Sequence, residues 1–152
     1  LESHDQPRFA SRVKEEGRFR NYLAFLYFAK GTTLLYSGSE FAPTHQVSLF
    51  DRDDACRERR QDWQALLGRL GRMKKELPVY SCFEATAEAD GLVTARYDGP
   101  EGHAWGVFGL QGDRGRVSVP LADGVYKNRV DGAAVTVAEG MISFSGDPVI
   151  LF

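Results

Sequence analysis

The pattern of hydrophobic and polar positions divides the chain into two parts, and the first part has the period of helices. Residues 19–30 (FRNYLAFLYFAK) are apolar almost all round, which is typical of a helix covered on several sides. A glycine at position 31 is expected to end it. A second, amphipathic helix is predicted where apolar residues recur at helical spacing: Trp63, Leu66, Leu67, Leu70 and Met73.

The segment between these helices contains one predicted strand and one long loop. Residues 32–36 (TTLLY) are β-prone and lack polar alternation, which predicts a strand buried on both faces of a parallel sheet. The loop that follows is charged, and a helix is expected to start near Asp53 or Asp54, both common residues at helix N-termini.

Beyond Pro78 the apolar period falls to two, and turn pairs such as Asp131-Gly132 separate short β-prone runs. The predicted strands are residues 79–83, 92–97, 105–110, 116–120, 124–128, 134–137, 141–144 and 149–152. Strands at this spacing predict an antiparallel sandwich. The expected fold class is therefore α+β, with a helical part (1–76) meeting a β part (77–152) through the apolar face of the second helix.

Composition and charge exclude several classes of protein. The chain has 152 residues, 43% of them hydrophobic and 26% charged, so it can fold around a core. A net charge of −2, with acidic and basic residues interleaved, argues against binding to nucleic acid or to a membrane surface. No apolar run reaches the roughly 18 residues of a membrane span.

The two cysteines, Cys56 and Cys82, lie in dissimilar contexts and lack the spacing of metal ligands. We therefore expect two free thiols, a reducing compartment and a cytoplasmic location, with no metal and no cofactor in this chain. The chain begins at Leu1 without a methionine, so any signal peptide would precede it.

A short motif near the start of the chain carries a resemblance to a known family. Ser3-His4-Asp5, with Arg8 close behind and a helix after it, resembles the fourth signature stretch of the α-amylase family, glycoside hydrolase family 13. The family reads Asn-His-Asp there, so Ser3 takes the place of the usual Asn.

A second motif extends this resemblance. Residues 31–40 (GTTLLYSGSE) are similar to the family's last barrel-strand motif, Gly-x-Pro with a later Tyr-x-Gly-x-Glu, although Thr33 replaces the Pro. Residues 121–128 (LADGVYKN) are similar to the C-terminal β-domain of these enzymes. The resemblance implies that residues 1–76 are the end of a catalytic (β/α)8 TIM barrel and that residues 77–152 are the C-terminal β-sandwich domain.

The resemblance also implies a chemistry, which is retaining cleavage of α-linked glucose oligomers or polymers. The family's nucleophile and acid/base carboxylates would lie upstream of Leu1, so this fragment alone is expected to be inactive. Asp5 matches a third carboxylate, which binds ring hydroxyls of the sugar at the cleavage point and stabilises the transition state. His4 would donate to the same sugar, and Glu40 would line the rim of the cleft.

The motif residues also have purely structural interpretations. Asp5 is placed to be a helix N-cap, and His4 to be a surface imidazole. Arg8 is placed to pair with Glu15 or Glu16.

Other polar and aromatic residues are assigned in the same way. Glu40 either lines the cleft or only holds its loop. His45 and Gln46 belong to a solvated loop that could reach the cleft. Trp105 and Tyr126 could stack on sugars, but their alternating strand positions favour the core of the sandwich.

Three other functions are compatible with these residues. A transglycosylase or isomerising member of the same family would share all of them, and a non-catalytic β-sandwich module that binds carbohydrate or has a structural role is the alternative outside enzymes. Coincidental resemblance in a small α+β protein is the third. The expected partners are an α-glucan and either the rest of the enzyme or a second copy of the chain, which would cover residues 19–36.

Overall fold

The computed structural model describes residues 1–54, 58–88, 91–112 and 114–152. The first half contains α1 (Phe9–Arg12), α2 (Glu16–Phe28), the 3-10 helix η1 (Ser39–Phe41) and α3 (Gln64–Glu76). The strands follow as β1 (Cys82–Ala87), β2 (Leu92–Gly99), β3 (Gly102–Gly109), β4 (Gly115–Ser118), β5 (Gly124–Lys127), β6 (Ala134–Val137), β7 (Met141–Phe144) and β8 (Val149–Leu151). The predicted combination of helices and antiparallel sheets is confirmed, and none of the described helices is long and apolar enough to cross a membrane.

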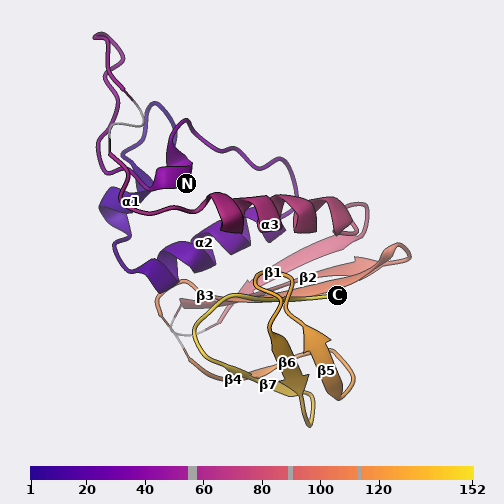
Figure 1. The fold of residues 1–152 in the computed structure, drawn as a ribbon. Helices are drawn as coiled ribbons and strands as arrows, with labels where there is room; N and C mark the ends of the chain where they lie inside the picture. Colours follow the sequence, from indigo (N-terminus) through magenta and orange to yellow (C-terminus); the bar gives the residue numbers. More distant parts are fainter. Residues whose placement is uncertain (55–57, 89–90, 113) are drawn as a thin grey trace.

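The strands form one larger sheet and two hairpin-like pairs. Four strands pair antiparallel in the order β1-β2-β3-β8, while β4 pairs with β7 and β5 pairs with β6. Tight turns join the first three strands, whereas β8 returns from the end of the chain to pair with β3, placing Leu151 opposite Trp105. The four-stranded sheet lies between the helices and the β4–β7 pair (Figure 1).

Strand β3 lies at the centre of this arrangement because both of its faces are buried. Ala104 and Phe108 belong to the core shared with the helices, whereas Trp105 and Val107 belong to the core shared with β4 and β7. Side chains alternate between the faces of a strand, so one apolar strand supplies both cores. The Phe28 ring of α2 lies 5.7 Å from the Phe108 ring, between their centroids.

Buried polar groups fix α2 on the sheet. Asn21 is fully buried; its Oδ1 accepts a hydrogen bond from the Gly109 amide at 2.8 Å, and its Nδ2 donates to the Gly146 carbonyl at 2.7 Å. Tyr97 donates its hydroxyl proton to the Phe28 carbonyl at 2.9 Å, and burial raises the pKa of Tyr97. These bonds satisfy polar groups that would be costly to bury unpaired.

The helices pack differently from the expectation in one respect. Helix α2 contacts β3 on one side and α3 on the other, so α2, and not α3, lies directly on the sheet. Leu23 and Phe28 are 3% and 0% exposed. The prediction that residues 19–28 need cover from outside the chain is therefore wrong.

The predicted strand at residues 32–36 is not formed. This segment is irregular, and it has no strand partner among the described residues. Leu34 is 66% exposed and Leu35 is 42% exposed. A β-prone run becomes a strand only when a neighbouring strand satisfies its backbone groups, and none lies beside this one.

The helix expected near Asp53 or Asp54 is also wrong in its position. Both residues are irregular, and the next described helix begins at Gln64. Residues 55–57, which include Cys56, lie outside the described residues. Cys82 is a free, exposed thiol on β1.

Candidate functional site

His4 and Asp5 lie at a turn before α1 and project into solvent. His4 Nε2 is 2.9 Å from Asp5 Oδ2, and the two side chains are 60% and 70% exposed. The Asp5 amide donates to the Ser3 hydroxyl at 3.3 Å, which steadies the turn. The structure therefore brings the two predicted residues together, with carboxylate and imidazole both accessible to a ligand.

The turn is anchored by a buried carboxylate, Glu2. Its Oε2 accepts a hydrogen bond from the Phe9 amide at 2.6 Å, at the start of α1. Its Oε1 accepts from Arg8 Nη1 at 3.3 Å and lies within hydrogen-bonding distance of the Ser39 hydroxyl, which is also 2.5 Å from the Tyr36 carbonyl. Glu2 thus ties the His4–Asp5 turn to the second motif.

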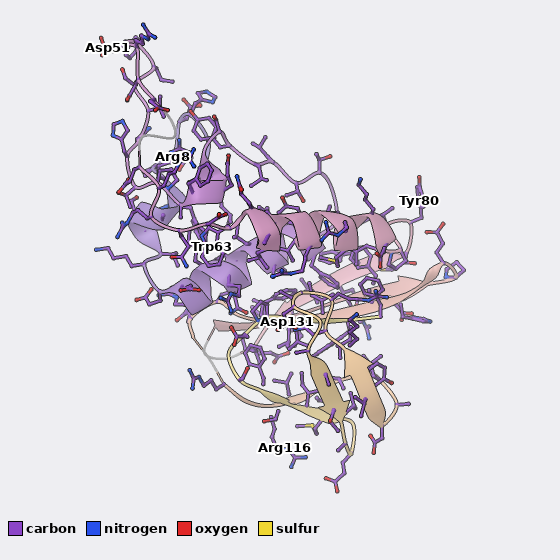
Figure 2. The ribbon with its side chains drawn as sticks, in the orientation of Figure 1. Arg8, Asp51, Trp63, Tyr80, Arg116 and Asp131 are labelled. Atoms are coloured by element: carbon purple, nitrogen blue, oxygen red, sulfur yellow. The ribbon has the colours of Figure 1, made fainter. Side chains whose placement is uncertain are left out.

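Arg8 completes this network from α1 (Figure 2). Its side chain is 1% exposed, and that of Glu2 is 7% exposed. The guanidinium lies 4.6 Å from the centre of the Tyr36 ring, and Nε donates to the His45 carbonyl at 3.2 Å. Arg8 Nη2 is buried without a hydrogen-bond partner. A single buried side chain therefore contacts both loops that face the turn.

Two of the structural interpretations of the motif are wrong. The N-cap residue of α1 is Arg8, and the carboxylate at this helix start belongs to Glu2, so Asp5 is not an N-cap. Arg8 pairs with Glu2 and not with Glu15 or Glu16. Asp5 therefore has no role in holding the helix, which leaves its carboxylate available.

The loop over residues 41–54 lies beside the turn and is itself hydrogen-bonded. Gln46 Nε2 donates to the His4 carbonyl at 3.3 Å. His45 Nε2 is 2.6 Å from Asp53 Oδ2, and the Ser48 amide donates to the same oxygen at 3.0 Å. The hydrogen bond from His45, and after it that from Ser48, lowers the pKa of Asp53 to about 2. The loop is thus held by its own polar contacts.

The Asp53 carboxyl is expected to titrate near pH 2 in the folded chain, below its ordinary value of 3.8. Because the folded pKa is the lower one, ionised Asp53 stabilises the loop above about pH 4, and this contribution is lost as the pH falls towards 2. The carboxyl ¹³C shift of Asp53 measures the midpoint. His45→Ala should raise it, whereas His103→Ala, which removes a histidine equally close to Asp98 (2.6 Å), should leave it unchanged. A midpoint near 3.8 in the unaltered chain would contradict the contact.

Glu40 lies in η1, where it is partly buried. Its carbonyl accepts a hydrogen bond from the Trp63 amide at 2.9 Å, so its backbone holds the start of α3. No hydrogen bond or ion pair joins its side chain to His4 or Asp5 among the described residues. The structure therefore supports the loop-holding interpretation of its backbone and leaves its carboxylate unassigned.

Glu2 and Ser39 are site residues that the sequence did not single out. A glutamate seven positions before Phe9 has no local pattern that marks it as buried, since its partners come from three separate segments. The remaining assignments agree with the sequence: Trp105 is 5% exposed and belongs to the core, and the Tyr126 hydroxyl donates to the Ala122 carbonyl at 2.8 Å.

The chemistry available at the turn is hydrogen bonding and charge stabilisation. An exposed carboxylate accepts hydrogen bonds from hydroxyl groups, and such charge-assisted bonds are stronger than neutral ones. Within the described residues, no group of three or more His, Cys, Asp or Glu side chains is arranged to hold a metal ion. The site is therefore suited to a neutral polyhydroxyl ligand.

Comparison with known proteins agrees with this class of site. Residues 84–151 match the family described as the bacterial alpha amylase C-terminal domain. The whole chain is similar to an alpha-amylase from Lactobacillus plantarum, with 29% identity, a TM-score of 0.92, and coverage of 99% of this chain and 36% of that one. A comparison with curated proteins found no match.

More distant structures share the fold. An Anoxybacillus alpha-amylase has 21% identity and a TM-score of 0.73, and covers 99% of this chain and 36% of its own. An alpha-amylase of Geobacillus thermoleovorans, solved with acarbose, has 19% identity and a TM-score of 0.69, with 99% and 37% covered. The chain thus spans little more than a third of the length of these proteins.

The fold and the matched domain define the C-terminal part of a carbohydrate-active protein. The chain is similar throughout to α-amylase family enzymes, and it belongs to that family, glycoside hydrolase family 13, as its C-terminal part.

Proposed function

We propose that this chain forms part of a retaining glycosidase that acts on α-linked glucose chains, to which it contributes an active-site carboxylate, Asp5, and the C-terminal domain. Residues 1–76 would complete a (β/α)8 barrel. The observation that carries the proposal is the exposed His4–Asp5 pair, held at a turn by the buried Glu2–Arg8 pair in a chain that superposes on an α-amylase with a TM-score of 0.92.

In this proposal Asp5 accepts hydrogen bonds from ring hydroxyls of the sugar at the point of cleavage. These bonds strengthen as the ring distorts and gains positive charge, so they stabilise the transition state more than the bound substrate. His4 donates to the same sugar and orients the Asp5 carboxylate through their 2.9 Å contact. The nucleophile and the acid/base would come from the rest of the barrel.

Two preparations test this division of labour. The purified 152-residue chain should release no chromophore from a chromogenic maltooligosaccharide. A chimera in which this chain replaces the corresponding part of the Lactobacillus plantarum alpha-amylase should hydrolyse the same substrate. A folded but inactive chimera would contradict the proposal, as would turnover by the isolated chain that Asp5→Asn abolishes.

The barrel proposal also predicts the behaviour of residues 32–36 in isolation. Leu34 and Leu35 are exposed, and their segment lacks a strand partner among the described residues, so we expect the isolated chain to self-associate there. Leu34→Lys with Leu35→Lys should give a monomer in sedimentation velocity across a concentration series. Val125→Lys is the control, because Val125 is 73% exposed on β5 and its replacement should leave association unchanged. A monodisperse monomer of the unaltered chain at high concentration would refute the placement.

A further inference from the structure

A groove on the four-stranded sheet lies apart from the His4–Asp5 turn. Two adjoining cavities, of about 320 and 310 Å³, share Arg96, Trp105 and Pro120 as lining residues. They lie on the face of the sheet that carries Trp105, opposite the face that packs against α2. Together they form one continuous groove.

The floor of the groove is a set of cross-strand rows. Glu84, Arg96 and Trp105 lie side by side on β1, β2 and β3, because Glu84 pairs with Arg96 and Arg96 pairs with Trp105. Side chains two positions along each strand point to the same face. The neighbouring rows on this face are therefore Thr86 with Thr94 and Asp98 with His103.

The wall comes from the segment that follows β4. Ser118, Val119 and Pro120 line one cavity, and Pro120 and Leu121 line the other. Val119 belongs to the core beneath β4 and β7, which fixes the position of this wall. The second layer therefore leaves the β1–β2 part of the sheet open and ends in an apolar border.

The charges of the floor are paired, which decides the kind of ligand. Arg96 Nη2 is 2.7 Å from Glu84 Oε2, and His103 Nδ1 is 2.6 Å from Asp98 Oδ1. The Glu84 and Arg96 side chains remain 58% and 48% exposed, so they can still donate and accept hydrogen bonds. An ionic ligand would break these pairs, whereas a neutral ligand that is rich in hydroxyl groups can bind to both signs of charge.

The dimensions point to a short chain of sugar rings. Three rows that are each two residues apart along the strands span roughly 14 Å, which is the length of a short oligosaccharide. Hydroxyl groups would meet the paired charges and the two threonines, and the C–H faces would meet Pro120, Leu121 and the edge of Trp105.

We propose that this groove is a second carbohydrate site, which binds a segment of α-glucan away from the point of cleavage. The choice of an α-linked glucan rests on the proposed function, whereas the location and the polyhydroxyl class rest on the groove itself. Such a site would hold a long substrate on the enzyme while its chain is cleaved elsewhere.

Titration of the ¹⁵N-labelled chain with maltoheptaose tests the site. The indole N–H signal of Trp105 should shift, and that of Trp63, which lies in the helical layer, should not. The double variant Glu84→Ala/Arg96→Ala should weaken binding about tenfold or more. Its matched control, Arg116→Ala/Glu139→Ala, removes an exposed ion pair that does not line the groove and should bind like the unaltered chain.

Each outcome separates this site from the proposed active site. Equal binding by both double variants, no binding at all, or equally tight binding of cellohexaose would overturn the proposal. If Asp5→Asn abolishes binding and Glu84→Ala/Arg96→Ala does not, the groove is refuted while the role of Asp5 stands. Groove binding by a chain whose amylase chimera is inactive would refute the proposed function and leave the groove in place.

Discussion

Asp5→Asn in the chimera with the Lactobacillus plantarum alpha-amylase should lower kcat by about 10²- to 10³-fold, which is the scale seen when one group that stabilises a transition state is removed. The structure motivates this expectation because Asp5 is exposed and has no part in capping α1. The amide keeps the shape of the side chain and removes its charge, so KM should change little. Initial rates over a range of maltooligosaccharide concentrations separate the two constants.

Asp51→Asn is a suitable control for this measurement. Asp51 is an exposed carboxylate at the far end of the neighbouring loop (Figure 2), and its substitution should leave both constants unchanged. If Asp5→Asn raises KM alone, the carboxylate contributes to binding of the ground state, and the transition-state role is wrong.

Arg8→Ala should lower the free energy of unfolding of the isolated chain by about 3–5 kcal/mol, because it leaves Glu2 as an uncompensated buried charge. The side chains of this pair are 1% and 7% exposed. The loss also removes the contacts that hold the turn to Tyr36 and to the His45 carbonyl. Urea unfolding followed by circular dichroism measures the difference.

Arg129→Ala provides a matched comparison. Arg129 and Glu76 are 3.3 Å apart, the same distance as Arg8 and Glu2, but their side chains are 37% and 52% exposed. Surface pairs of this kind contribute about 0–1 kcal/mol. Equal losses for the two variants would show that burial of the Glu2–Arg8 pair has no special effect. Replacing both residues, as Glu2→Leu/Arg8→Met, should recover much of the stability because no single charge is left buried.

The β part of the fold could be predicted closely because its signals are local. Turn pairs such as Asp131-Gly132 mark the ends of strands, and residues 134–137 and 141–144 are the observed bounds of β6 and β7. The pairing of β8 with β3 could not be predicted, since it joins segments about forty residues apart and no local pattern selects the partner. In the same way, the apolar run of β3 does not show which of its residues face which core.

The helical part illustrates the converse. The apolar residues of α2 predicted a covered helix, and the structure confirms the cover but supplies it from α3 and β3 within the chain. At residues 32–36 the local propensity is that of a strand, and the segment stays irregular because nothing lies beside it to pair with among the described residues. For the site, the His4–Asp5 pair follows from adjacent residues, whereas Glu2 and Ser39 meet only through tertiary packing.

The central claim, that Asp5 grips the sugar at the cleavage point, is tested most directly by a crystal structure of the chimera bound to acarbose. The account predicts that both Asp5 carboxylate oxygens lie within hydrogen-bonding distance, about 2.5–3.0 Å, of ring hydroxyls of the inhibitor unit at that point. An Asp5 carboxylate that still faces solvent, with the inhibitor bound elsewhere in an active chimera, would contradict it.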